Sequence, residues 1–467
     1  MSTPDIVTIF DIRHSITTTS SKFRSHRTTM KPKRALPTIA LATTLPTASA
    51  QTAESGQGAP TLTETLQALN DSLSTLNSYI QTQQFLFAAI NGTSGITILA
   101  PSNDAMAGLF GGGDGGGGGA VTMDDLNNSD PQLVEAFWNY HVLRGVWWTS
   151  NLTAGTAGTG GGGDGSATTA ANRKRKKRDD SVDGDGSGID GNSLFIPTLL
   201  SPDITPYANV SGGQRVIARS SSSSDGGGEP VVTFYSGISG SGGGSQQITK
   251  STITQANFNF SGGTIHIIDH VLSLPSRLND TLASFGPFSS SSTNQDDEVS
   301  SSASSLLSLT ASVGALSRAN LTDIFNTKQD ITIFVPSNDA WNAVGSVVSD
   351  MDENELAGIM GYHVLKGQKG KVFYSDLLMQ NDNSDGEAGG SEGGEEFEKD
   401  YETVEGGTVK VRVVDGSTST EDVINAEDDD DDDDETSGSG KQVFVNGARV
   451  VKSDVLVENG VVHVVDG

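Results

Sequence analysis

The residues of this chain best suited to chemistry are four histidines, because they stand in motifs that occur twice. They are His141, His266, His363 and His463. Two imidazoles in each copy could begin a metal site, but catalytic zinc sites use three protein ligands and no third ligand accompanies these pairs. Each histidine also lies among apolar residues of expected strands. The sequence therefore predicts no metal and no other cofactor, and instead buried imidazoles that are hydrogen-bonded to the backbone.

Two serines, Ser102 and Ser337, stand in matching Pro-Ser-Asn turns and raise the question of a nucleophile. An activated serine needs a base and an orienting acid within reach, and nothing in the sequence places His141 or His363 there. A turn that leads from a strand into a helix explains all three residue types, with the asparagine as the helix N-cap. No catalytic residue is predicted. The turn residues are Pro101, Ser102, Asn103, Pro336, Ser337 and Asn338.

Three motifs occur twice in the same order, which indicates two homologous domains. The paired segments are 96–105 with 331–340, 140–143 with 362–365, and 263–269 with 460–466. Besides the turn residues, those expected to serve structure are Tyr140, His141, His266, Asp269, Tyr362, His363, His463 and Asp466.

These motifs resemble the fasciclin-like domain, over about 61–274 and 306–467. The resemblance implies a wedge-shaped β-sandwich with helices packed beside it, in an extracellular adhesion or matrix module without catalysis. In animal members, an Asp-Ile step before the last motif is tied to integrin binding. Asp454-Val455 has a similar place in the second copy, whereas the first copy has Thr252-Ile253. Integrin binding is therefore not inferred, and Asp454 remains a candidate partner contact.

The spacing of apolar residues predicts an α+β fold in both domains. Leucines and one isoleucine between 62 and 80 recur at steps of three and four, which places them on one face of an amphipathic helix. Matching helices are expected at 131–140 and 353–362. Alternating segments that predict strands follow in both copies, at 214–218, 231–235, 253–260, 409–413, 443–445 and 450–457.

The composition predicts long disordered insertions, because Gly- and Ser-rich runs bury too little apolar surface to offset the entropy of ordering. The chain of 467 residues contains 57 glycines. Insertions are expected at about 111–120, 154–193, 220–229, 380–400 and 416–440, with a Ser-rich linker at 280–305. The acidic run at 428–434 could hold calcium loosely, but it lacks the spaced ligands of a calcium loop, which favours a solvated loop.

The net charge of −29 argues against nucleic acid or an anionic membrane as partner. The absence of cysteine excludes thiol chemistry and disulfides. Residues 30–50 resemble a signal peptide with cleavage before Gln51, which makes 1–29 an upstream extension; a disordered polar N-terminus is the alternative. We expect no transmembrane helix and no lipid-anchor signal, and a second domain whose last strand is truncated at Gly467.

Asn-x-Ser/Thr sequons support the secretory route, where they are modified. They begin at Asn70, Asn91, Asn127, Asn151, Asn209, Asn259, Asn279 and Asn320. The basic run 173–178 reads as an exposed site for a processing protease that cuts after Arg178, with nuclear import as the alternative.

The sequence thus predicts a secreted or cell-surface tandem protein that binds an extracellular protein or a cell-wall or matrix component. Two linked modules would add avidity. The alternative is a small-molecule or polysaccharide-binding module that uses Trp147 and Trp148 as a stacking surface. A hydrolytic enzyme is the least supported class, because no catalytic constellation recurs in both copies.

Overall fold

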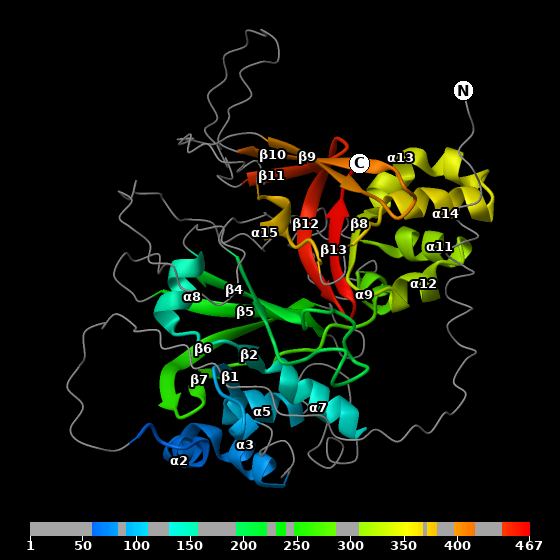
Figure 1. Ribbon diagram of the computed structural model, residues 1–467. Coiled ribbons are helices and arrows are strands. Elements are labelled where there is room, and N and C mark those ends of the chain that lie inside the picture. Colours follow the sequence, from blue (N-terminus) through cyan, green and yellow to red (C-terminus); the bar gives the residue numbers. More distant parts are fainter. Residues whose placement is uncertain are drawn as a thin grey trace, which may run out of the picture. The chain divides into compact units, whose positions relative to one another are not determined.

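The β-branched run of the first motif and the Gly-led run of the last motif form neighbouring parallel strands in each domain's sheet. In the first domain β1 (Ile96–Pro101) pairs in parallel with β7 (Gly263–Ile268), and in the second β8 (Ile331–Pro336) pairs in parallel with β13 (Gly460–Val465). The computed structural model describes residues 58–82, 90–110, 130–156, 193–221, 230–239, 247–285, 308–367, 371–380, 397–415 and 441–467, of which Pro60–Gly467 belong to one unit. Figure 1 shows both sheets.

The sheet of the first domain has seven strands in the order β2-β1-β7-β6-β5-β4-β3. The strands not yet given are β2 (Val142–Arg144), β3 (Leu194–Pro197), β4 (Arg215–Ser221), β5 (Val231–Ser239) and β6 (Gln247–Phe260). All pairs except β1–β7 are antiparallel. A bridge between Leu143 and Thr198 joins the two ends of this order. The sheet therefore curls back on itself around the core.

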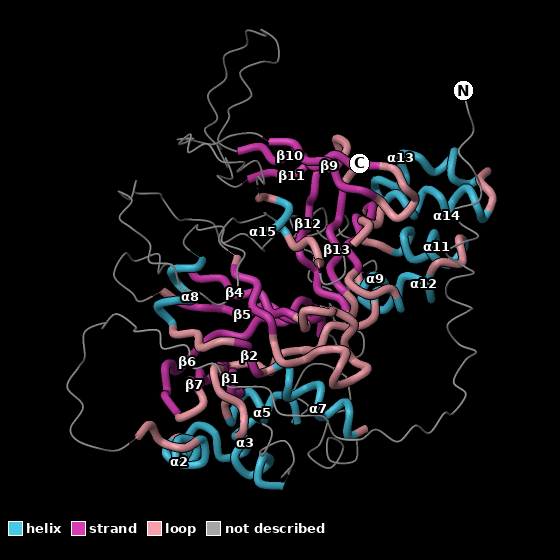
Figure 2. The backbone as a smooth tube through the Cα atoms, in the orientation of Figure 1, coloured by secondary structure: helices cyan, strands magenta, loops and turns pink. Residues whose placement is uncertain are grey.

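The helices of the first domain that precede β2 pack against β1, β2 and β6, whereas the one that follows β2 packs against β3, β4 and β5 (Figure 2). They are α2 (Leu62–Ala68), α3 (Asn70–Thr82), α5 (Asn103–Phe110), α7 (Pro131–Tyr140) and α8 (Thr149–Thr156). The expected single helix over 62–80 is wrong: α2 ends at Leu69, whose backbone leaves the helical region, and Leu73 is also non-helical. Both helices still turn their leucines into one core, because the break preserves the apolar face.

The second domain repeats this plan with six strands in the order β8-β13-β12-β11-β10-β9. The further strands are β9 (Phe397–Glu402), β10 (Thr408–Asp415), β11 (Lys441–Val445) and β12 (Ala448–Val457). Its helices are α9 (Leu278–Ser284), α11 (Thr310–Arg318), α12 (Thr322–Thr327), α13 (Asn338–Ser349), α14 (Glu353–Tyr362) and α15 (Ser375–Leu378). Bridges of Val364 to Ile333 and of Leu365 to Thr403 link the two ends of the sheet.

The prediction of two α+β domains is confirmed, but two boundaries differ. Leu278 and Leu282 of α9 are buried in the core of the second domain, although the linker was expected from residue 280. Residues 397–400 belong to β9, although the insertion was expected to reach 400. Both segments are polar enough to look like loops, and tertiary contacts order them.

Several predictions concern residues outside the described ranges: the extension 1–29, the signal peptide 30–50, the sequon at Asn127, the processing site at Arg178, and most of the insertions and linker. Among the described residues, no helix combines the length and apolarity needed to cross a membrane.

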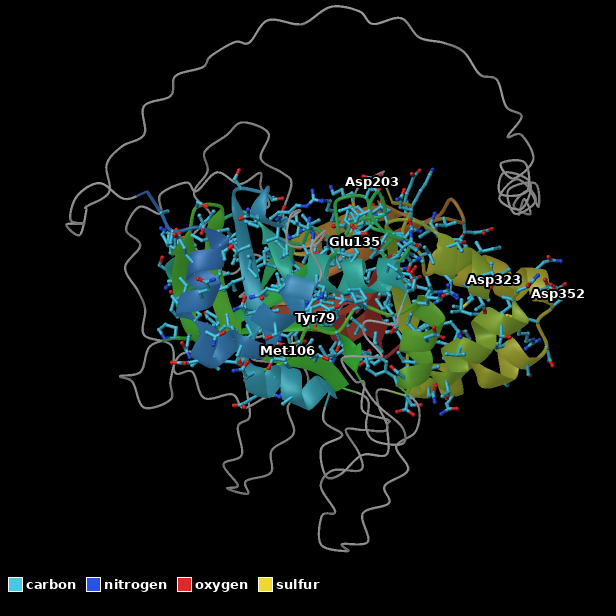
Figure 3. The ribbon with its side chains drawn as sticks, turned by 90° about the horizontal axis from the view of Figure 1, so that it is seen from below. Tyr79, Met106, Glu135, Asp203, Asp323 and Asp352 are labelled. Carbon is cyan, nitrogen blue, oxygen red and sulfur yellow. The ribbon has the colours of Figure 1, made fainter. Side chains whose placement is uncertain are left out.

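The surface and the core separate as the composition suggests. Tyr79 and Met106 are buried in the first domain, whereas Asp323 and Asp352 lie exposed on helices of the second (Figure 3). Acidic side chains at such positions keep the strongly anionic chain solvated.

The close approach of β8 and β13 gives a test of the central pairing. A Cβ on Gly460 would lie 1.9 Å from the carbonyl oxygen of Ile331, which is far inside contact distance. We expect Gly460→Ala to lower the free energy of unfolding by about 3 kcal/mol or more, because backbone must move to relieve the overlap. Chemical denaturation of the full chain measures this change.

The matched control is Gly314→Ala in α11, where nothing lies within 4 Å of the added Cβ. Helix propensity predicts a gain of about 0.5–1 kcal/mol there. A Gly460→Ala protein as stable as the wild type would contradict the close packing of β8 against β13.

Candidate functional site

The histidine of the last motif is buried in both domains and binds backbone on both sides. His266 Nε2 donates to Trp147 O at 2.6 Å, and His463 Nε2 donates to Phe373 O at 3.0 Å. Their Nδ1 atoms accept backbone N–H groups, from Asn257 at 3.2 Å and from Asp454 at 3.4 Å. An Nδ1 that accepts places the proton on Nε2, so both rings are neutral. Burial lowers both histidine pKa values.

The residues that donate to these histidines sit on bulges and have left-handed backbones, with φ of 64° at Asn257 and 60° at Asp454. Their side chains reach the start of a short helix. Asn257 Oδ1 accepts from Thr149 N at 3.0 Å, and Asp454 Oδ1 accepts from Ser375 N at 2.8 Å. The two positions are therefore structural equivalents in the two domains.

This geometry overturns the prediction that Asp454 is a partner contact. Asp454 is only 4% exposed, and its carboxylate faces inward to satisfy the first turn of α15. The sequence comparison also paired Asp454 with the wrong residue, Thr252. Asn257 is the true counterpart, because it stands six residues before Gly263 as Asp454 stands six residues before Gly460, and both donate their backbone N–H to the histidine of the last motif.

The histidines after the Tyr step end the helices that precede them. His141 Nδ1 donates to Phe137 O at 2.8 Å, and His363 Nδ1 donates to Ile359 O at 2.9 Å. His141 Nε2 also accepts from Leu272 N at 3.0 Å. Burial lowers the pKa of His141 to about 4 and also lowers the pKa of His363. Both rings hold backbone together rather than act as bases.

In the Pro-Ser-Asn turns, the helix cap is a different residue from the one predicted. The serine is the cap: Ser102 Oγ accepts from Ala105 N at 3.1 Å, and Ser337 Oγ accepts from Ala340 N at 3.2 Å. Each hydroxyl is thus held by its own helix.

The asparagine of the turn binds a preceding helix instead of capping its own. Asn103 Oδ1 accepts from Thr75 N at 2.9 Å, where α3 is irregular. Asn338 Oδ1 accepts from Ala311 N at 2.9 Å in the first turn of α11. The predicted N-cap role is wrong because the serine one residue earlier has the extended backbone that a cap requires.

The remaining motif residues also have structural roles. Pro101 and Pro336 end β1 and β8. Asp269 Oδ1 accepts from Thr252 N at 2.6 Å, and Asp466 Oδ1 accepts from Arg449 N at 2.9 Å, which closes the same hairpin in both domains. The tyrosines diverge, because Tyr140 is fully buried whereas Tyr362 is 46% exposed.

A cluster of polar and aromatic side chains lies where the start of α15 in the second domain meets β4 of the first. The Arg215 guanidinium lies 5.1 Å from the centre of the Tyr374 ring, and Phe195 stacks on the same ring at 5.1 Å. Tyr374 is fully buried. Motif analysis missed this cluster because its members lie in different domains and in no repeated motif.

Two carboxyl groups share that cluster. Burial raises the pKa of Asp376 to about 6, the neighbouring Asp454 adds to the rise, and Arg215 opposes it. The Asp454 Oδ2 atom has no hydrogen-bond partner among the described residues. A buried carboxylate left half-satisfied is costly, so the nearby cation has a clear stabilising role. The cluster can hold charge at a domain contact. Among the described residues, no three His, Asp or Glu side chains come together as a metal site.

Trp147 and Trp148, the expected stacking surface, are both half-buried. Trp147 packs on the core of the first domain and its indole N–H donates to Arg144 O at 2.8 Å. Most described sequon asparagines are exposed, namely Asn70, Asn91, Asn151, Asn259 and Asn320, whereas Asn209 and Asn279 are half-buried.

Comparison with known proteins gives a consistent result. A family model described as Fasciclin domain matches residues 71–184 and 307–467. The first match ends at residue 184, outside the described residues. The strands β3 to β7 that follow are paired in the same order as β9 to β13 of the second domain.

Two fungal relatives share that description. A fasciclin-like arabinogalactan protein of Arthroderma benhamiae is 26% identical over 46% of this chain and 35% of its own length, so the match spans about a third of that relative. The fasciclin-like arabinogalactan protein elcF of Phaeosphaeria nodorum is 23% identical over 86% of each chain. A solved FAS1 domain pair from the insect cell adhesion molecule fasciclin I is 17% identical, covers 85% of this chain and 96% of its own, and has a TM-score of 0.29.

The neutral histidines make stability depend on pH. At neutral pH His141 is unprotonated in both the folded and the unfolded chain. Below its unfolded pKa of about 6.5 only the unfolded chain gains the proton, until the folded pKa of about 4 is reached. We expect His141 alone to remove about 3 kcal/mol of stability between those values. NMR titration of the imidazole and unfolding curves at several pH values measure this, and a His141 that titrates near 6.5 would contradict its burial.

The asparagine contacts between helices give a second test. We expect Asn338→Ala to lower the free energy of unfolding by about 1–2 kcal/mol, because it removes the acceptor of Ala311 N in α11. Thermal unfolding measures the loss. The control is Asn342→Ala, at an exposed position of the same helix, for which we expect almost no change. Equal melting temperatures for both variants would refute the bridging role.

Proposed function

The chain belongs to the fasciclin domain family, and on this premise we propose that it is a non-enzymatic extracellular or cell-surface glycoprotein that mediates cell adhesion or matrix or cell-wall association. The match includes the first part of the first domain, 71–184, and the second domain, 307–467. The names of the fungal relatives join the family to arabinogalactan, a polysaccharide, which supports the wall-association part of the proposal.

One observation carries the proposal. The motif residues that could have done chemistry are held in structural hydrogen bonds: the serines cap helices and the histidines join backbone segments. Among the described residues, no His, Asp or Glu side chain is hydrogen-bonded to either serine hydroxyl, as an activating base would be. Exposed loops and sheet faces then remain as the functional part of the surface, and exposed sequons on it suit a secreted protein.

The outer face of β9, β10 and β11 supports the second candidate, a polysaccharide-binding module. It forms an open depression of about 490 Å³ lined by Glu398, Lys410, Arg412, Phe444, Asn446 and Gly447. The Arg412 guanidinium lies 5.4 Å from the centre of the Phe444 ring, and Lys410 pairs with Glu398 at 2.7 Å. An aromatic ring with converging polar groups is the usual make-up of a small polar-ligand site. This face suits a sugar better than the Trp147 indole, which packs on the core.

The proposal predicts a secreted, glycosylated protein. We expect the full chain, expressed in a eukaryotic secretory host, to appear in the medium or at the cell surface with its N-terminus near Gln51 and with a mass that falls on glycosidase treatment. Mass spectrometry of medium and cell fractions measures both. Unglycosylated protein confined to the cytosol would contradict the proposal.

Adhesion and sugar binding are separated with beads that carry the secreted protein. Protease treatment of the target cells is expected to abolish bead attachment if the partner is a protein, and polysaccharide hydrolases to abolish it if the partner is a wall glycan. In the second case the double variant R412A/F444A should lose attachment while Trp148→Ala, at a half-buried tryptophan of the first domain, retains it. Beads that attach to no cell and no wall preparation would count against both functions.

A further inference from the structure

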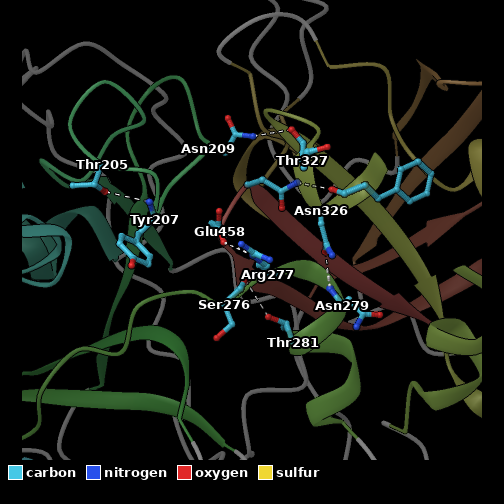
Figure 4. A network of polar contacts seen from close by, with 12 residues as sticks. Thr205, Tyr207, Asn209, Ser276, Arg277, Asn279, Thr281, Asn326, Thr327 and Glu458 are labelled. Atoms are coloured by element: carbon cyan, nitrogen blue, oxygen red, sulfur yellow. Dashed lines mark hydrogen bonds and ion pairs between the residues drawn. The ribbon is translucent and has the colours of Figure 1, made fainter. Parts of the chain in front are cut away.

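The sequon Asn209-Val210-Ser211 lies between β3 and β4 and contacts the second domain. Asn209 Nδ2 donates to Thr327 O at 2.9 Å, as Figure 4 shows. The backbone N–H of Asn209 donates to Glu458 O at 2.8 Å. The asparagine that would carry a glycan is therefore bound to two segments of the other domain.

The serine of the same sequon is bound as well. Ser211 N donates to Asp330 Oδ1 at 2.7 Å, and Ser211 Oγ donates to Asp330 Oδ2 at 2.6 Å. Asp330 is 4% exposed. Val210 between them is 3% exposed and belongs to an apolar cluster with Tyr374 and other residues of the second domain. Hydrogen bonds to a buried carboxylate are among the stronger ones, so this contact holds the sequon firmly.

Glycosylation makes chemical demands that this arrangement does not meet. The Asn209 Nδ2 atom must attack the anomeric carbon of an oligosaccharide carried on a lipid diphosphate. A bond forms between Nδ2 and that carbon, the bond from carbon to the diphosphate oxygen breaks, the lipid diphosphate leaves, and Nδ2 gives up one proton to solvent. The transferring enzyme recognises the hydroxyl of the third residue, and here both Nδ2 and the Ser211 hydroxyl already serve the second domain.

We propose that a glycan on Asn209 and the contact between the two domains exclude each other. A bulky, solvated sugar on Nδ2 would have to fit beside Thr327 O, where a hydrogen bond now lies. In the closed pair the two domains make this contact, and in the open pair they do not. The modification is compatible with the open pair alone, so it shifts the equilibrium toward that state, and the closed pair protects the sequon. Exposed sequons such as Asn259 and Asn320 lack this constraint. The inference rests on the proposed secretory route.

The test uses the full chain behind a host secretion leader, so that entry into the secretory route does not depend on residues 30–50. Peptide mass spectrometry gives the glycan occupancy of Asn209, Asn259 and Asn320. Hydrogen exchange in the same sample follows the Ser211 amide separately in glycosylated and unmodified peptides. We expect the glycosylated copies to exchange at least about tenfold faster. Equal protection in both populations overturns the proposal.

Variants test the proposal in samples where every copy of Asn209 is unmodified or every copy is glycosylated. If Asn209 is unmodified, Asp330→Gly is expected to make its glycosylated peptide detectable. Glycine accepts the backbone φ of 55°, and the sequon stays intact. Gln214→Leu, which removes a 2.7 Å bond to Val457 O, is the second opening variant. The matched control is the exposed Asp323→Asn, with unchanged occupancy. An Asn209 that stays unmodified in both opened variants overturns the proposal.

If Asn209 is fully modified in the wild type, Asn209→Gln removes the glycan and keeps an amide. We then expect exchange at Ser211 to slow by at least about tenfold, while Asn259→Gln leaves it unchanged. Unchanged exchange in Asn209→Gln overturns the proposal. Failure of the chain to be secreted without the host leader would count against the secretory function and leave this exclusion standing.

Discussion

Each domain depends on one parallel pairing, between the first strand of the repeat and the last. Ile96 pairs with Gly263, and Ile331 pairs with Gly460. Parallel neighbours need a long crossover, so everything between these strands must return the chain to the same edge. The glycine at the start of the last strand allows an approach that a Cβ would prevent. The remaining strands continue from β7 or β13, and in the first domain β2 also attaches on the other side, next to β1.

The histidines supply connections that the sheet cannot. At the bulges of β6 and β12 the backbone leaves the ladder, which would strand an N–H group in the interior. The Nδ1 atoms of His266 and His463 accept those N–H groups, and the Nε2–H groups tie down the loops that carry Trp147 and Phe373. A neutral imidazole can accept at one nitrogen and donate at the other, and burial lowers the pKa of both rings because it penalises the charged form.

The sequence was sufficient to predict the repeat, the α+β class, most strands and the buried histidines, because periodicity and matched motifs report directly on which faces are apolar. It failed where two residue types compete for one role. Ser102 and Asn103 are both good caps, and only the backbone shows that the serine takes that position. It failed again at Asp454, which was compared with Thr252 although Asn257 stands at the same six-residue distance from the glycine of the last motif. The contacts of Arg215 and Asn209 with the second domain carry no local signal at all.

The two copies differ in one exchange that only the domain contact explains. The first domain has a neutral amide, Asn257, at the bulge, and the second has a carboxylate, Asp454, in the same place. A buried carboxylate beside another acid, Asp376, destabilises a domain unless a cation offsets it. The second domain receives that cation from the first, because Arg215 of β4 lies over Tyr374 and opposes the pKa rise of Asp376. Arg215 of the first domain therefore favours the ionised form of Asp376 in the second. The charge balance in the second domain thus depends on its contact with the first. The sequon at Asn209 borders the same contact.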